Sequence, residues 1–203
     1  MYKVVILDLD GTLVRTYIDW ESIRERIREI LGLSKDAPLK PIATTVIKYY
    51  SKNEKFSNVI ELIESEELRS IESAVCPSKI PELLRNLRKC NYRVALVTLR
   101  SWRTTKPLLD KAGIQGVFDL IVTRDDAADR VSQLLKVMEF FRVRKEEVLF
   151  IGDWIGDVEA GKLAGVKTVI VEGPEEVVDL ITDLLANCRH IERWVRADYR
   201  VVL

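Results

Sequence analysis

The sequence lacks several features that are typical of particular classes of protein, and each absence argues against one class. Its three cysteines, Cys76, Cys90 and Cys188, are widely spaced without a Cys-x-x-Cys pair, which argues against a zinc site or a disulfide framework. Basic and acidic residues balance at 32 each, which argues against nucleic acid as the main partner. No apolar run approaches the ~20 residues of a membrane-spanning helix, and no cleavable signal precedes the first predicted strand. We therefore expect a cytoplasmic protein that acts away from membranes.

The first strand delivers two acids to its end. Residues 4–7 are all apolar, which is typical of a strand buried on both faces. Asp8 and Asp10 follow at its C-terminal end, where ligands bind in open α/β sheets, and Gly11 lets the backbone turn away. Two carboxylates 4 Å apart repel by roughly 4 kcal/mol at an effective dielectric near 20, so a divalent cation such as Mg²⁺ could hold them. An Asp-Gly turn with an incidental second acid is the alternative.

A second apolar run, residues 148–151, also ends in acids. It leads into Gly152-Asp153-Trp154-Ile155-Gly156-Asp157, and Asp157 begins a predicted helix that runs through Ala164 and stops at Gly165. Two such strand ends in one sheet favour a shared metal site over an incidental turn.

The rest of the chain separates into a helical part and an α/β part. Residues 15–78 show helical apolar spacing in three segments, with Asp19 as a predicted N-cap and Pro41 in the first turn of the second helix. From Pro81 on, helices alternate with short apolar strands at 93–97, 120–123, 148–151 and 167–171, which predicts a doubly wound parallel sheet. The tail, residues 187–203, shows no assignable element. Its Trp194 and Tyr199 are expected to pack on the core or on a second subunit, so a monomer and a homodimer both remain open.

The two acidic motifs, Asp8-Leu9-Asp10-Gly11-Thr12-Leu13 and Gly152-Asp153-Trp154-Ile155-Gly156-Asp157, resemble those of the haloacid dehalogenase superfamily, in particular its phosphoglycolate phosphatase-like members. The resemblance covers about residues 1–185. It implies a Rossmann-like α/β core of residues 1–14 and 79–203, with a small helical cap, residues 15–78, inserted after the first strand. It also implies Mg²⁺-dependent hydrolysis of a small phosphorylated metabolite, a phosphate monoester, through an aspartyl-phosphate.

The resemblance assigns a role to each motif residue. Asp8 would be the nucleophile, and Asp10 the acid that protonates the leaving oxygen and then activates water. The Asp8 carboxylate, the Asp10 carbonyl, Asp153 and Asp157 would hold Mg²⁺. The transferring phosphoryl would be bound by Thr98, the backbone N–H groups of Leu9 and Leu99, and a cation, for which Arg130 is the nearest candidate.

Two departures from the family pattern stand out. Family phosphatases usually carry a lysine in the loop before the second acidic motif, at a position near Ala128, but residues 119–128 contain none. Arg130 is the nearest cation and Arg124 the next. Trp154 is bulky where the family usually has a small polar residue. A phosphomutase, or a non-enzymatic protein that binds a phosphorylated ligand or a protein partner, therefore remains an alternative. The cap residues that would select the substrate, among them Tyr17, Trp20 and Tyr49, form no recognisable motif.

Overall fold

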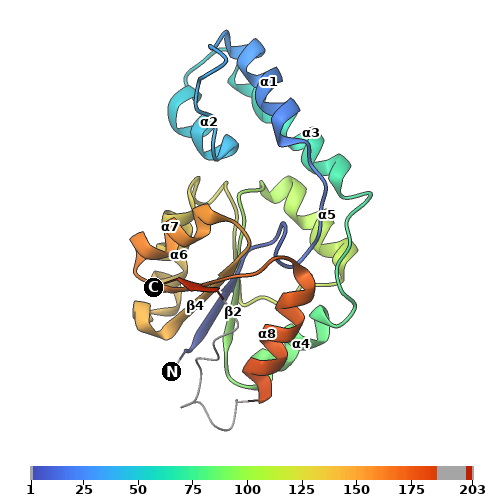
Figure 1. The fold of residues 1–203 in the computed structure, drawn as a ribbon, viewed down its shortest axis with the longest axis vertical. Helices are drawn as coiled ribbons and strands as arrows, with labels where there is room; N and C mark the ends of the chain where they lie inside the picture. Colours follow the sequence, from blue (N-terminus) through green and yellow to red (C-terminus); the bar gives the residue numbers. More distant parts are fainter. Residues whose placement is uncertain (1, 187–199, 203) are drawn as a thin grey trace.

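The core of the protein is a single twisted sheet. In the computed structural model, which describes residues 2–186 and 200–202, six strands follow the order β3-β2-β1-β4-β5-β6 (Figure 1). They are β1 Val4–Leu7, β2 Arg93–Val97, β3 Leu120–Val122, β4 Val148–Gly152, β5 Lys167–Ile170 and β6 Arg200–Val202. The first five are parallel to their neighbours, as predicted. β6, which the sequence analysis left unassigned, pairs antiparallel with β5 at the edge.

Helices cover both faces of the sheet, which explains why β1 has no polar position. Val5 and Leu7 face one apolar cluster, shared with α4 Ile80–Lys89, α5 Trp102–Ala112 and α8 Pro174–Ala186. Val4 and Ile6 face the other, shared with α6 Arg130–Phe141 and α7 Ile155–Ala164. Successive side chains of a strand point to opposite faces, so burial on both sides requires an unbroken apolar run. The doubly wound arrangement is thus confirmed.

Element boundaries follow the predicted signals to within a few residues. α7 begins at Ile155, two residues before the predicted start at Asp157, because Trp154 already has the extended backbone of an N-cap. A short 3₁₀ helix, Lys145–Glu147, precedes β4. Asn91, which follows α4, has the left-handed conformation, with φ 65°.

The helical cap consists of three helices above the C-terminal edge of the sheet (Figure 1). They are α1 Trp20–Leu31, α2 Ile42–Tyr50 and α3 Phe56–Ser70, and they share an apolar cluster separate from the core clusters. The Asp19 side chain caps α1 by accepting from the Ser22 N–H, as predicted. Pro41 is the N-cap of α2 and not a residue of its first turn. The segments entering and leaving the cap meet in an antiparallel bridge between Arg15 and Val75.

Most of the tail lies outside the described residues, including Cys188, His190, Trp194 and Tyr199 and the packing expected of these aromatics. Among residues 2–186 and 200–202, none of the helices combines the length and the apolar character needed to cross a bilayer.

Candidate active site

The two acidic motifs meet because β1 and β4 are neighbours in the sheet. Leu7 is level with Ile151 on β4 and with Leu96 on β2. The Asp8 N–H donates to the Ile151 carbonyl at 2.9 Å and so continues the ladder by one residue. Asp8 therefore leaves the sheet beside the loop that carries Asp153, and both loops open at the edge where ligands bind in such sheets.

Three of the four predicted acids form a cluster. Carboxylate oxygens of Asp8, Asp153 and Asp157 lie within 4.8 Å of one another. Gly11, at φ +75°, makes this approach possible, because a Cβ there would lie 2.0 Å from Oδ2 of Asp153. Asp153 is an exposed residue whose carboxyl group lies against this glycine.

The electrostatics of the cluster raise the pKa of Asp8 and of Asp153. Burial raises the pKa of Asp8 well above the usual range of an aspartate, and the neighbouring carboxylates add to this rise. The charge of Arg130 acts in the opposite direction. Burial, and next the charge of Asp157, raise the pKa of Asp153 to about 6. A divalent cation would stabilise the charged forms of these groups, and three oxygen donors this close suit Mg²⁺, so the donor set fits the metal that the family resemblance implies.

The carboxylate of Asp10 turns away from this cluster to Arg100, which the sequence analysis did not consider. Nε of Arg100 donates to Oδ2 of Asp10 at 2.7 Å and Nη2 to Oδ1 at 2.8 Å. The Thr16 hydroxyl donates to the same Oδ1 at 2.6 Å. Arg100 is 2% exposed and also donates to the Glu67 carbonyl and the Ser70 hydroxyl on α3. Arg100 therefore links Asp10 to the cap.

Arg130, the first residue of α6, reaches into the acidic cluster. Its Nη2 donates to Oδ1 of Asp8 in a short contact, and its Nε donates to Oδ1 of Asp157 at 2.9 Å. Its Nη1 donates to the amide oxygen of Gln133 at 2.9 Å. The guanidinium carbon lies 5.7 Å from the centre of the Phe150 ring. A cation is thus in direct contact with the predicted nucleophile.

The predicted phosphate-binding residues of β1 and β2 lie at the same edge. Thr98 is buried, its N–H donates to the Val122 carbonyl, and its hydroxyl oxygen accepts from the Arg100 N–H at 3.1 Å. The Leu9 side chain is buried in the core, so this residue can offer a ligand only its backbone. The Leu99 carbonyl accepts from Arg124 at 3.1 Å. The Trp154 ring folds over Gly156 at the start of α7 and is 41% exposed.

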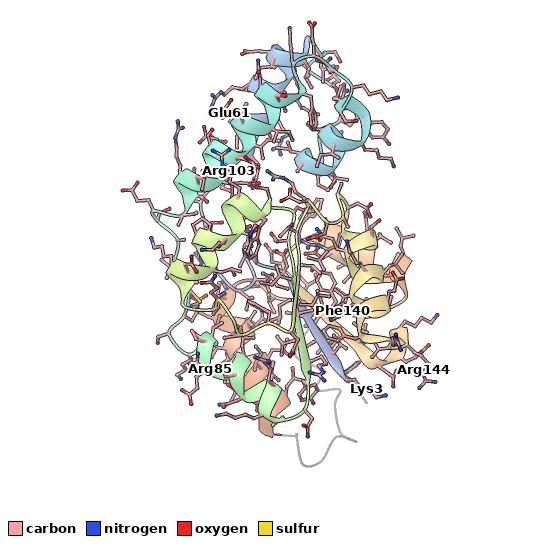
Figure 2. All side chains as sticks on the ribbon, turned by 180° about the vertical axis from the view of Figure 1, so that it is seen from behind. Lys3, Glu61, Arg85, Arg103, Phe140 and Arg144 are labelled. Atoms are coloured by element: carbon pink, nitrogen blue, oxygen red, sulfur yellow. The ribbon has the colours of Figure 1, made fainter. Side chains whose placement is uncertain are left out.

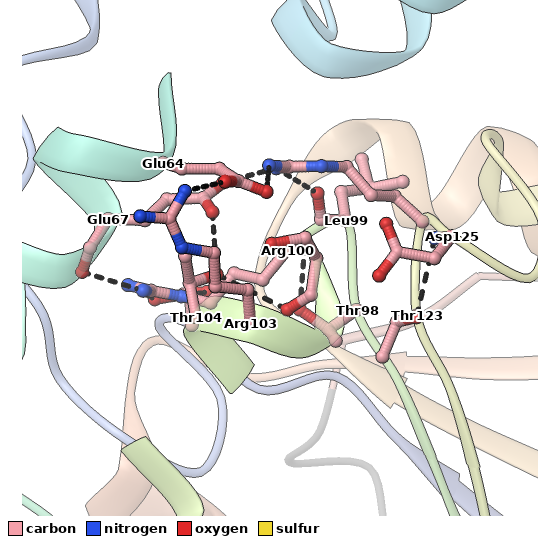
Figure 3. A network of polar contacts seen from close by, with 12 residues as sticks. Glu64, Glu67, Thr98, Leu99, Arg100, Arg103, Thr104, Thr123 and Asp125 are labelled. Atoms are coloured by element: carbon pink, nitrogen blue, oxygen red, sulfur yellow. Dashed lines mark hydrogen bonds and ion pairs between the residues drawn. The ribbon is translucent and has the colours of Figure 1, made fainter. Parts of the chain in front are cut away.

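Arg124, the second candidate for the phosphate cation, belongs to the interface between cap and core. Its Nη1 lies 2.5 Å from Oε1 of Glu67, which is 1% exposed, and its Nη2 lies 3.4 Å from Glu64. The Thr104 hydroxyl donates to Glu67 at 2.7 Å and Arg103 pairs with Glu64 at 2.8 Å (Figure 3). Burial raises the pKa of Glu67 although the charge of Arg124 opposes the rise. These ion pairs join α3 to the core. Arg124 therefore contacts the cap and not the acidic cluster.

The cap also touches the core through α2. The Thr44 hydroxyl donates to the Ala128 carbonyl at 2.6 Å, two residues before Arg130. Of the aromatics considered for substrate selection, Tyr17 is 80% and Tyr49 67% exposed, whereas Trp20 is 38% exposed.

Sequence reasoning missed Arg100, Glu67 and Gln133 because their roles arise from contacts between distant segments. In the sequence, Glu67 stands among other glutamates of one predicted helix, which is typical of an exposed helix surface. Gln133 carried one signal: it lies three residues after Arg130, and residues at this spacing share a face where both belong to one helix, as they do in α6.

Sequence and fold comparisons identify the family of the chain. Residues 5–171 match the family model of haloacid dehalogenase-like hydrolases. The chain belongs to this family. The resemblance inferred from the two acidic motifs is thereby confirmed.

Named relatives of this haloacid dehalogenase-like hydrolase include phosphatases. It is 31% identical over 178 residues to a phosphoglycolate phosphatase of Aquifex aeolicus, covering 83% of this chain and 84% of the relative. It is 26% identical to pyrophosphatase PpaX of Bacillus mycoides, covering 90% and 95% of the two chains. A haloacid dehalogenase-like hydrolase from Streptococcus pneumoniae has the same fold, with a TM-score of 0.62, 20% identity and coverage of 91% and 97%.

Proposed function

We propose that this protein is a Mg²⁺-dependent phosphatase that hydrolyses a small phosphate monoester through an aspartyl-phosphate. One observation carries the proposal: Asp8, at the C-terminal edge of the sheet, touches the guanidinium of Arg130 and lies beside the carboxylates of Asp153 and Asp157. A nucleophile, a cation for the phosphoryl charge and a set of oxygen ligands for a metal thus converge on one point.

The nucleophile has to be ionised. Burial raises the pKa of Asp8, and Arg130 counters this rise by its charge. An oxygen of Asp8 then attacks phosphorus in line, a bond forms between them, and the bond from phosphorus to the leaving oxygen breaks. Arg130, the Thr98 hydroxyl and the N–H groups of Leu9 and Leu99 would hold the equatorial oxygens of the phosphoryl group. Water attack on phosphorus then releases phosphate and restores Asp8.

Asp10 supplies and removes the proton in this scheme. It would protonate the leaving oxygen in the first step and take a proton from the attacking water in the second. Oδ1 accepts two hydrogen bonds, from Arg100 and Thr16, whereas Oδ2 accepts one from Arg100, so Oδ2 keeps a free acceptor position for the proton that this scheme requires.

Mg²⁺ would be held by the carboxylates of Asp8 and Asp153 and by the Asp10 carbonyl, with Asp157 as a ligand or as a partner of a ligand. When bound, the ion would neutralise negative charge on the phosphoryl oxygens. The ion pair between Arg130 and Asp157 supports this proposal, because it joins the proposed phosphate cation to a proposed metal ligand.

The alternatives differ in what they require of Arg130. A non-enzymatic protein that had lost its phosphate cation would not need a guanidinium against Asp8, whereas a phosphatase would. A phosphoanhydride is a second candidate substrate, since some relatives are named pyrophosphatases. A phosphomutase shares the first chemical step and differs in the acceptor.

A substrate panel tests the proposal. The protein is incubated with phosphate monoesters, inorganic pyrophosphate and an aryl phosphate, with Mg²⁺ or with excess chelator, and released phosphate is measured. We expect turnover of at least one monoester that stops on chelation and returns with Mg²⁺. Full activity in excess chelator would contradict the metal dependence. If phosphate were released from pyrophosphate but from none of the monoesters, the proposed substrate class would be wrong and a phosphoanhydride would take its place.

A further inference from the structure

Gln133 is a buried amide that uses all of its hydrogen-bonding groups around the candidate site. The residue is fully buried on α6. Its Nε2 donates to the Thr98 carbonyl at 2.7 Å and to the Ala127 carbonyl at 3.0 Å. Its Oε1 accepts from Nη1 of Arg130 at 2.9 Å. One side chain thus connects the end of β2, the loop before α6 and the guanidinium that touches Asp8.

These partners allow only one orientation of the amide. A carbonyl oxygen can only accept and a guanidinium N–H can only donate, so the amide nitrogen has to face the two carbonyls and the amide oxygen has to face Arg130. Exchange of the two ends would place acceptors against acceptors and donors against a donor. Gln133 therefore offers Arg130 a fixed acceptor.

The chain places the two residues together through α6. Asp129 caps this helix by accepting from the Ser132 N–H, so Arg130 is its first residue and Gln133 its fourth. Residues three apart lie on the same helix face. The position of Gln133 is thus set by the helix and by two backbone carbonyls, none of which needs Arg130 to be in place.

The three partners of Arg130 hold different edges of its guanidinium. Asp157 accepts from Nε, Asp8 from Nη2 and Gln133 from Nη1. Asp8 has to exchange partners when it attacks phosphorus, and Asp157 is placed beside a metal site. Gln133 is a neutral partner that lies outside the carboxylate cluster, so it can hold the guanidinium while the charges around it change.

We propose that Gln133 is a positioning residue, which holds the Arg130 guanidinium in the orientation that binds the transferring phosphoryl group. This rests on the proposed function, because it assigns phosphate binding to Arg130. Gln133 acts through Arg130 and touches neither substrate nor metal. Loss of one hydrogen bond to a charged group corresponds to an effect of about ten- to a hundredfold on phosphate binding and on kcat/KM.

A double-mutant cycle tests this. Gln133→Met keeps the volume but neither donates nor accepts as an amide does. The cycle combines Gln133→Met with Arg130→Ala and measures kcat and KM for an aryl phosphate with Mg²⁺, together with the Kd of inorganic phosphate by calorimetry. We expect Gln133→Met to weaken phosphate binding and kcat/KM by about ten- to a hundredfold in the wild type and by a clearly smaller factor in Arg130→Ala, where only the contacts with the Thr98 and Ala127 carbonyls are lost. Gln115→Met, at the chain's other glutamine, which is exposed, should change neither.

A second variant is available if Gln133→Met does not fold, and the possible results distinguish this inference from the proposed function. Should Gln133→Met fail to fold in urea titrations, Gln133→Asn takes its place, because its shorter amide cannot reach both carbonyls and Arg130 together. Equal effects of the Gln133 change with and without Arg130 would show a merely structural role and overturn the inference. A wild type without metal-dependent turnover would instead overturn the proposed function, and with it any role for Arg130 in the reaction.

Discussion

Replacement of Arg130 by alanine removes the cation that contacts Asp8, and its effect follows from the three contacts of the guanidinium. Nε and Nη1 each donate at 2.9 Å, to Asp157 and Gln133, and Nη2 donates to Asp8, so the group is preorganised before any substrate arrives. Removal of one preorganised donor from a site that stabilises developing charge costs about 2.7–4 kcal/mol. We therefore expect Arg130→Ala to lower kcat by about a hundred- to a thousandfold.

Arg130→Lys separates charge from geometry. A lysine ammonium carries the same charge, but on a flexible stem with three donors at a single point, so it cannot span Asp157, Gln133 and Asp8 as the planar guanidinium does. We expect it to recover part of the activity lost in Arg130→Ala, to a level about tenfold below that of the wild type, since about one charged hydrogen bond is not restored.

The assay is steady-state hydrolysis of an aryl phosphate with saturating Mg²⁺, with unfolding curves run in parallel to confirm the fold. Arg85→Ala is the matched control, because Arg85 is an exposed arginine on α4, away from the acidic cluster (Figure 2). Unchanged kcat in a folded Arg130→Ala protein would refute the assignment of Arg130 as the phosphate cation.

Three further predictions follow from individual side chains. Asp8→Asn should abolish turnover while the fold persists, because the amide keeps the volume but is no nucleophile, and wild-type activity in this variant would exclude the covalent mechanism. Between its unfolded pKa near 4 and its folded pKa of about 6, Asp153 holds a proton that the unfolded chain has lost, so stability without metal should fall as the pH rises through this window. Asp153→Asn should flatten that part of the curve in urea titrations at pH 4 to 7, and an unchanged slope would contradict the raised pKa of Asp153. Glu67→Gln should lower the free energy of unfolding by about 3 kcal/mol by depriving buried Arg124 of its closest charge, whereas Glu61→Gln, at an exposed position of the same helix, should have little effect.

Much of the fold could be predicted because its signals are local. The apolar run of β1 is explained by burial on both faces, and Asp19 begins α1 through a hydrogen bond of its own side chain. β6 escaped prediction because a strand of three residues at a sheet edge depends on its partner β5 more than on its own sequence.

Only the site residues that lie in the two acidic motifs could be predicted with their neighbours. Asp8 and Asp153 could be expected together, since parallel strands bring their C-terminal ends to one edge. The sequence indicated Arg130 as the cation nearest to the expected position but not the contacts of its guanidinium with Asp8, Asp157 and Gln133. The turn of Asp10 towards Arg100 could not be foreseen either, because Ser70 and the Glu67 carbonyl, which hold Arg100, come from a helix of the cap.

The bridge between Arg15 and Val75 bears on how this fold can acquire new substrates. The two residues exchange backbone hydrogen bonds of 2.8 and 3.0 Å, so the insertion leaves and re-enters the core at one point. An antiparallel pair of this kind can be closed by a turn as short as two residues. Deletion or exchange of the cap would therefore leave the ends of the core segments adjacent, but it would also remove the α3 partners of the buried Arg124 and Arg100, which would have to be supplied again. A chain shortened in this way would present Asp8 and Arg130 on an open surface, accessible to phosphate groups on macromolecules too large to enter beneath three helices.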